Sequence, residues 1–187
     1  MGVVIGCPMR TDDDEPGASA CDSAGPMAQM AAGAAMGLLL RDATPADIPA
    51  LMAIEQVCFD SPVAFNRRRI RNLITNPRVY TSVAVVDGSV AGWAVGLVRR
   101  HHSHRSGRLY NLAIATAARG RGVGRRLVEH LLACFSRAGV RHIYLEVEAG
   151  NAAAIALYER CGFTQVRTLN DYFGSGRPGI SMRRSVT

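Results

Sequence analysis

The chain has 187 residues, of which 48% are hydrophobic and 20% are charged, and its formal net charge is +7. This length suits one domain with a substantial core. No stretch reaches the run of about 18 apolar residues that a membrane span needs, which excludes a membrane-spanning protein. The cysteines form no CxxC pair, which argues against a disulfide framework and against a zinc site, and we expect a cytoplasmic protein. They are Cys7, Cys21, Cys58, Cys134 and Cys161.

The charge is divided unevenly along the chain. Residues 1–37 hold one arginine against five acidic residues, a net charge of −4, which leaves +11 for residues 38–187. A basic domain attracts polyanions, so a phosphorylated cofactor, an acidic protein surface and nucleic acid are all candidate partners. Nucleic acid has only the charge in its favour, because no RNA- or DNA-binding motif accompanies it. We therefore do not expect a nucleic-acid-binding protein.

The first 37 residues are rich in Ala, Gly and Met and carry an acidic run at residues 12–15. Their small apolar side chains can bury little area, so we expect a disordered N-terminal extension. A signal peptide is not expected, since the basic start is missing and the acidic run interrupts any apolar stretch. Met27, Met30 and Met36 offer later starts, and we place the folded domain at residues 38–187.

The N-terminal half of this domain predicts alternating strands and helices. Thr44-Pro45-Ala46-Asp47 reads as a helix start, Ser61-Pro62 breaks the chain, and Asp87-Gly88 marks a hairpin turn. Phe65 lies between the two helices, where it either packs the loop onto the core or lines a substrate groove. The expected elements are a strand at 38–41, helices to about 57 and at about 66–74, and strands at 79–86 and 90–98.

The centre of the chain predicts a strand, a glycine-rich turn and a helix. Residues 109–114 are mostly apolar, glycines follow at positions 120, 122 and 124, and an amphipathic helix runs to Gly139. Glycines let a backbone approach a ligand closely, and the first N–H groups of a helix have no intrahelical acceptor. The turn therefore predicts a phosphate site. His101, His102 and His104, just before the strand, are read as a polar loop and not as metal ligands.

Three nucleotide-binding patterns compete for this turn. A P-loop needs a lysine, and all 22 basic residues of this chain are arginines. A dinucleotide fingerprint has Arg125 where its third glycine belongs, although Glu146 supplies its acidic residue, so this pattern stays open as an alternative. The acyl-CoA pattern R/Q-x-x-G-x-G/A is met by Arg119, Gly122 and Gly124.

The C-terminal part predicts a strand at 141–148, a helix at 151–160 that ends at Gly162, and strands near 163–169 and 180–183. The expected fold is α/β (α+β): a mixed, mostly antiparallel sheet of about seven strands with helices on both faces.

The segments LEV, NAAAIALYE and GF within residues 145–163, taken with RGRGVG at 119–124, resemble the GNAT superfamily of N-acetyltransferases. They look especially like the bacterial ribosomal-protein alanine N-acetyltransferases (RimI-like). The resemblance covers residues 38–187 in element order. It implies a single GNAT domain with splayed central strands, and acetyl-CoA as co-substrate without a metal.

The resemblance also assigns roles to residues. It makes Glu146 the general base and Tyr158 the general acid, while Glu148, on the same strand face, could share the base role or alter the acceptor preference. The acceptor side would include Tyr172, in the sequence Asp171-Tyr172-Phe173. Cofactor contacts would come from the backbone of Leu112, Ala113 and Ile114, from the turn residues Arg119, Gly120, Arg121, Gly122, Val123 and Gly124, and from Asn151, which also reads as a helix N-cap.

The implied function is acetyl transfer from acetyl-CoA to a primary amine, foremost the α-amine of a protein or peptide N-terminus, by direct attack in a ternary complex. Two alternatives stay open. The acceptor could be a small-molecule amine, or the chain could be an acyl-CoA-binding regulatory module without turnover.

Overall fold

The structure, a computed structural model, describes residues 37–59 and 64–186. The predicted N-terminal extension, apart from Gly37, and the Ser61-Pro62 break lie outside these residues. Within them, no helix has the length and apolar character required to cross a membrane.

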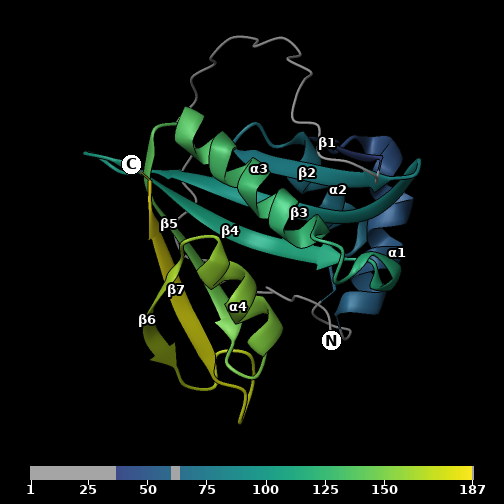
Figure 1. Cartoon of the computed structure of the whole chain (residues 1–187). Coiled ribbons are helices and arrows are strands. Elements are labelled where there is room, and N and C mark those ends of the chain that lie inside the picture. Colours follow the sequence, from purple (N-terminus) through teal and green to yellow (C-terminus); the bar gives the residue numbers. More distant parts are fainter. Residues whose placement is uncertain (1–36, 60–63, 187) are drawn as a thin grey trace.

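One sheet of seven strands forms the centre of the fold, in the order β1-β2-β3-β4-β5-β7-β6 (Figure 1). Only the β4–β5 pair is parallel, and all other neighbours are antiparallel. The predicted mixed, mostly antiparallel sheet is therefore confirmed. The strands are β1 (Leu38–Asp42), β2 (Val79–Val86), β3 (Ser89–Arg100), β4 (Arg105–Ile114), β5 (Val140–Glu148), β6 (Thr164–Leu169) and β7 (Gly179–Ser185).

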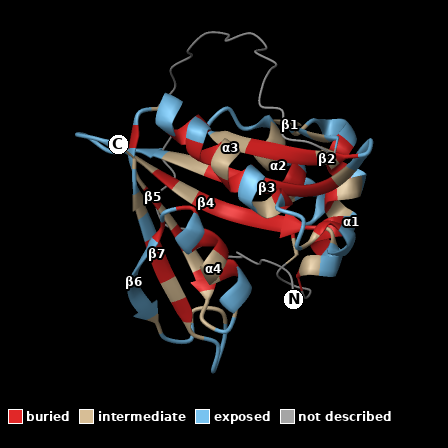
Figure 2. Ribbon diagram, in the orientation of Figure 1, coloured by how far each residue is buried: buried red, intermediate tan, exposed pale blue. Residues whose placement is uncertain are grey.

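Helices cover both faces of the sheet and divide the core in two. One apolar cluster lies between the sheet and the helices α3 (Val123–Arg137) and α4 (Ala152–Arg160). The other lies between the sheet and α1 (Ile48–Cys58) and α2 (Arg67–Thr75). Strand β4 is buried along most of its length and β3 along its middle, because both strands contact both layers (Figure 2).

The first helix starts later than the sequence suggested. Thr44 and Asp47 form a capping box, but residues Pro45–Asp47 make a 3₁₀ turn and α1 begins at Ile48. The reason is Pro49, which has no N–H to donate to the carbonyl of Pro45. That carbonyl accepts the N–H of Ile48 instead, which is the tighter bond of a 3₁₀ turn.

Asp47 holds this turn against β1, and we predict that its replacement lowers the stability of the fold in a pH-dependent way. Its carboxylate accepts two bonds of 2.7 Å from Arg41 and one of 2.7 Å from the Thr44 N–H, and the Arg41 bonds lower its pKa from 3.8 to about 2. A lowered carboxyl pKa stabilises the fold above the unfolded-state pKa and loses that effect as pH falls through the folded-state pKa. Asp47→Asn should reduce the unfolding free energy at pH 7 by about 1–2 kcal/mol, allowing for the exposure of Arg41. In urea titrations, this difference should shrink between pH 4 and pH 2, and a constant difference would contradict the account.

Candidate active site

Strands β4 and β5 separate in the middle of the sheet. They pair only between residues 105–108 of β4 and 140–144 of β5. Beyond this, β4 stays with β3 as far as the Ile114–Gly92 pair, and β5 stays with β7 as far as Glu148–Gly179. Residues 109–114 and 145–148 therefore flank a stretch without β4–β5 backbone pairing, called here the β4–β5 opening. The predicted splay of the central strands is present.

A β-bulge interrupts β4 at the start of this opening. Val95 of β3 pairs with Asn111 and Gly96 pairs with Leu109, so Tyr110 is the extra residue. A bulge disturbs the alternation of side chains along a strand. Tyr110 joins the α1/α2 cluster and the next residue, Asn111, also reaches α1, where it donates to Glu55. Two consecutive side chains thus face the same layer.

Glu146 lies at the inner end of the opening, on the α1/α2 side. Its neighbours Leu145 and Val147 belong to the cluster beneath α3 and α4, so alternation turns Glu146 to the opposite face. Arg108 Nη2 donates to Glu146 Oε2 at 2.5 Å and to Tyr172 Oη at 3.0 Å. One arginine therefore brings together the predicted base and the predicted acceptor-side aromatic.

Tyr158 reaches the sheet from the other face. It belongs to the cluster beneath α3 and α4, its ring packs edge-on against Phe163, and it is fully buried. Its hydroxyl has no hydrogen-bond partner among the residues that the structure describes. Burial, with a smaller effect of Cys161, raises its pKa well above the usual value. The hydroxyl therefore carries its proton at neutral pH, as a general acid requires.

Glu148, the other candidate base, is engaged by Arg177. Arg177 Nε donates to its Oε1 at 2.7 Å and Nη2 to its Oε2 at 3.0 Å. These bonds lower the pKa of Glu148, and a carboxylate with a lower pKa is a weaker base. Arg177 thus holds Glu148 beside the segment that joins β6 and β7, as Arg108 holds Glu146 beside Tyr172.

The glycine turn leads directly into α3. Gly120 and Gly122 have φ of 73° and 79°, a backbone region that favours glycine. The first α-helical bond runs from the Arg126 N–H to the Gly122 carbonyl, and no side chain of residues 37–59 or 64–186 caps this helix end. The N–H groups of residues 123–125 therefore have no intrahelical acceptor, which suits an anion.

The arginines around the turn do not act alike. Arg119 folds back, donating through Nε to the Ile114 carbonyl at 3.1 Å and through Nη2 to Cys58 Sγ at 3.4 Å. Arg125 and Arg126 pair with Glu129. Of the four arginines near the turn, only Arg121 has no partner among the described residues. The backbone and Arg121 are thus the groups placed to meet phosphates, while Arg119 ties the turn to β4.

A substitution of Gly124 tests how the turn binds the cofactor without destabilising the fold. It is helical, and an added Cβ would lie 3.4 Å from Leu157 Cδ2 and 3.7 Å from Ile114 Cγ1, in ordinary contact. Gly124→Ala should keep or slightly raise thermal stability because alanine favours helix. Because the acyl-CoA pattern R/Q-x-x-G-x-G/A accepts alanine at this position, acetyl-CoA affinity should stay within about twofold of that of the unchanged protein. Calorimetric titration checks this, and a loss of about tenfold in affinity would contradict the assignment of the turn to that pattern.

Asn151 is the N-cap of α4, because its Oδ1 accepts the Ala154 N–H at 3.1 Å. Its predicted contact with the cofactor stays a prediction. Phe65 is buried, stacks on Tyr110 at 5.7 Å between ring centroids and meets Trp93 edge-on at 6.0 Å. Of the two expected roles for Phe65, the structure supports packing of the loop onto the core.

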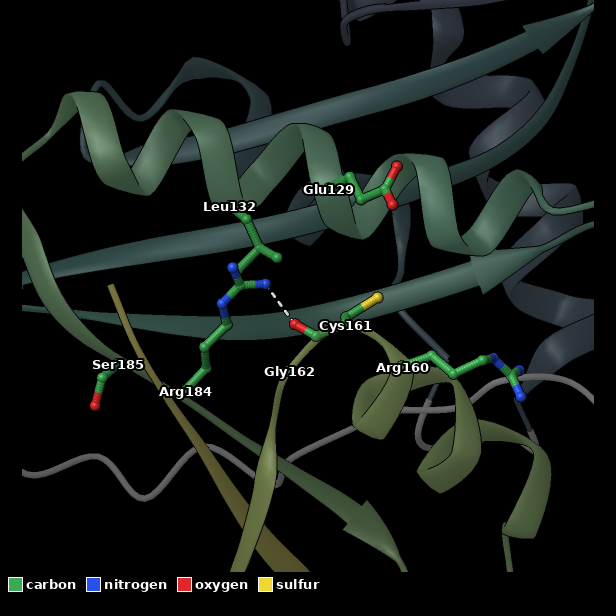
Figure 3. A pocket seen from close by; sticks show the side chains of 7 residues that line it. All are labelled: Glu129, Leu132, Arg160, Cys161, Gly162, Arg184 and Ser185. Carbon is green, nitrogen blue, oxygen red and sulfur yellow. Dashed lines mark hydrogen bonds between the residues drawn. The ribbon is translucent and has the colours of Figure 1, made fainter. Parts of the chain in front are cut away.

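A separate hollow of about 540 Å³ lies between α3 and the C-terminal end of α4 (Figure 3). Two of its charged side chains are already engaged: Arg184 Nη1 donates to the Cys161 carbonyl, and Glu129 binds Arg125. None of the predicted site residues lines it. The hollow is therefore not the candidate active site.

Two residues of the site area were missed from the sequence. Arg108 carries no local signal, because its partners Glu146 and Tyr172 lie far along the chain. Glu55 does carry one: it shares a helical stripe with Ile48 and Leu51, so a carboxylate stands where the pattern requires an apolar residue. It is completely buried. Burial raises its pKa, which N–H donors and Arg69 oppose.

Comparison with known proteins agrees with this geometry. Residues 48–163 match the sequence profile of the Acetyltransferase (GNAT) family. The N-alpha-acetyltransferase RimI of Mycobacterium tuberculosis is 36% identical over 125 residues, which are 66% of this chain and 73% of that protein. The [Ribosomal protein bS18]-alanine N-acetyltransferase of Escherichia coli (strain K12) is 43% identical over 65 residues, 35% of this chain and 44% of that enzyme.

The fold agrees as well. The crystal structure of a ribosomal-protein-alanine N-acetyltransferase from Brucella melitensis superposes with a TM-score of 0.69 at 30% identity, over 79% of this chain and 99% of that one. The matched stretches cover 39% and 44% of the length of two curated relatives. With its profile match, its RimI relative and its splayed sheet, the chain belongs to the GNAT acetyltransferase family.

Proposed function

We propose that the protein transfers the acetyl group of acetyl-CoA to the α-amine of a protein or peptide N-terminus, by direct attack while both substrates are bound. The observation that carries this proposal is the β4–β5 opening, with Glu146 on one face of the sheet and the buried hydroxyl of Tyr158 on the other. A base on one face of the sheet and an acid on the other can serve two different substrates that meet between β4 and β5.

The residues present fit acetyl-CoA. The Tyr158 hydroxyl has no hydrogen-bond partner in the described part of the chain, as a group that meets a ligand sulfur would, and the uncapped start of α3 suits a pyrophosphate. The backbone of Leu112, Ala113 and Ile114, the turn at residues 120–124 and Asn151 would hold the molecule. Acetyl-CoA supplies an acetyl group activated as a thioester.

The side chains of this chain account for the proton transfers. An α-ammonium must lose a proton before its nitrogen can attack, and Glu146 accepts that proton directly or through one water. The new bond joins the amine nitrogen to the acetyl carbon as the bond from that carbon to sulfur breaks, and the nitrogen then loses its second proton to solvent. Tyr158 gives its proton to the departing sulfur and regains one from solvent. The net products are an N-acetylated terminus and free CoA thiol.

The acceptor enters from the α1/α2 side in this proposal, since Glu146 faces that layer. Tyr172 lies there beside Arg108, and Phe65 packs on the same side of the sheet against Tyr110 of β4. Relatives that are named for acetylating an alanine of a ribosomal protein make a peptide with N-terminal alanine the first probe.

A peptide that carries both an N-terminal alanine and an internal lysine tests the proposal. With acetyl-CoA, mass spectrometry should find the acetyl group on the α-amine, and the same peptide with a formylated N-terminus should not react. Turnover with polyamines or amino acids alone would replace the peptide acceptor by a small amine. Binding of acetyl-CoA without turnover on any amine would support the regulatory module instead.

A further inference from the structure

Glu55 is a buried charged group that the proposed chemistry does not use. Its side chain, on α1, is fully shielded from solvent yet accepts three N–H bonds. Oε1 accepts from Trp93 Nε1 at 3.0 Å and from Asn111 Nδ2 at 2.8 Å, and Oε2 accepts from the Phe65 backbone N–H at 3.1 Å. A buried carboxylate is costly unless its bonds are complete, so an apolar residue here would pack at lower cost.

The two oxygens of Glu55 hold two different parts of the fold. Oε1 binds the strand side, where Trp93 lies on β3 and Asn111 lies in the bulge of β4. Oε2 binds the loop side, because Phe65 lies in the connection between α1 and α2. One buried carboxylate therefore links the Phe65 backbone to β3 and to the bulge of β4.

A second link closes the same arrangement. Arg69 of α2 donates to the hydroxyl of Tyr110, the other bulge residue, and its guanidinium lies 4.3 Å above the Phe65 ring. Phe65 itself stacks on Tyr110. Asn111 is thus bound by α1 and Tyr110 by α2. Phe65, between these helices, contacts Glu55 of α1 and Arg69 of α2.

We propose that Glu55 is a positioning residue, which sets Phe65, in the α1/α2 layer from which the acceptor would enter, relative to the β4 segment expected to hold acetyl-CoA. The inference rests on the proposed acetyl transfer for its functional consequence. Glu55 touches neither substrate, and it acts through Phe65 on one side and Asn111 on the other.

Glu55→Gln separates the two sides. The amide keeps a carbonyl oxygen for Trp93 and Asn111, but places an N–H₂ group against the Phe65 N–H, so only the loop bond is lost. KM for the alanine peptide should rise about tenfold, while the Kd of acetyl-CoA, measured by calorimetry, stays within about twofold. Glu159→Gln, an exposed change on α4, is the matched control and should alter neither constant.

Asn111→Leu removes a bond on the strand side instead. It should weaken acetyl-CoA binding more than it raises the peptide KM, the reverse of Glu55→Gln. If Glu55 only stabilised the fold, Glu55→Gln and Asn111→Leu would each lower the fraction of active protein. The peptide KM and the acetyl-CoA Kd of the remaining active protein would then be unchanged. Equal effects of the two variants on both constants, or no effect of Glu55→Gln on the peptide KM, would overturn the proposal.

Hydrogen exchange of the wild-type protein tests the link without acetyl transfer and without a variant that must fold. The Phe65 amide lies in a loop, yet it should exchange as slowly as the amides of β3, because its acceptor is the buried Glu55. Fast exchange would overturn the proposal even if the peptide is acetylated. A slow Phe65 amide in a protein that acetylates no peptide would refute the proposed function and leave the link standing.

Discussion

Replacing Glu146 by glutamine should lower kcat with a peptide acceptor by about 10²–10³-fold, because an amide can accept the Arg108 hydrogen bond but cannot take a proton. The Kd of acetyl-CoA should stay unchanged, since Glu146 faces the α1/α2 layer and not the α3/α4 layer. Steady-state kinetics at saturating acetyl-CoA together with calorimetry check both parts.

The loss in Glu146→Gln should also depend on pH in a defined direction. An α-amine with a pKa of about 7.7–8.0 is mostly protonated at pH 6.5 and mostly free at pH 9, where a base is less needed. The variant should therefore recover toward wild-type activity as pH rises. Glu148→Gln should mainly change the acceptor KM. A kcat loss in Glu148→Gln as large as in Glu146→Gln would mean that both carboxylates share the base role.

Replacing Tyr158 by phenylalanine should lower kcat about 10²-fold without destabilising the protein. The hydroxyl is completely buried and finds no acceptor or donor within the described ranges, so its removal breaks no hydrogen bond and relieves a desolvation cost of about 1–3 kcal/mol. Loss of activity with equal or higher thermal stability is the combination that distinguishes a catalytic hydroxyl from a structural one.

Two measurements test whether the Tyr158 hydroxyl is catalytic or structural. Thermal unfolding of Tyr158→Phe should give a melting temperature at or above that of the wild type, and stopped reactions should show the reduced rate at saturating substrates. A melting temperature lowered by several degrees would indicate a structural partner for the hydroxyl. A kcat within about threefold of the wild type would remove Tyr158 from the proton transfers.

Local patterns predicted the parts of the fold that depend on nearby residues. The stripe of α3 from Val123 to Phe135 is buried as its spacing predicted, and Gly122 takes the left-handed φ that the turn requires. The alternation of Glu146 and Glu148 against Leu145 and Val147 places both carboxylates on one face, as a strand must.

The contacts between side chains of the candidate site could not be predicted from local sequence patterns. Arg108 meets Glu146 across two strands, and the bulge at Tyr110 is a register shift that no property of β4 alone announces. Arg119 donates through its guanidinium to the Ile114 carbonyl, which depends on how the turn folds back on β4, and its expected contact with the cofactor stays a prediction. Such features arise from pairing between distant segments, for which a single sequence carries no pattern.

The most direct test of the central claim is a crystal structure with a conjugate in which the α-amine of an alanine peptide is joined through an acetyl group to the sulfur of CoA. The account predicts that the sulfur lies within hydrogen-bond distance of Tyr158 Oη and that the pyrophosphate lies against residues 120–124. The peptide should leave the β4–β5 opening on the side of Glu146. A sulfur remote from Tyr158, or a peptide that leaves on the α3/α4 side, would contradict it.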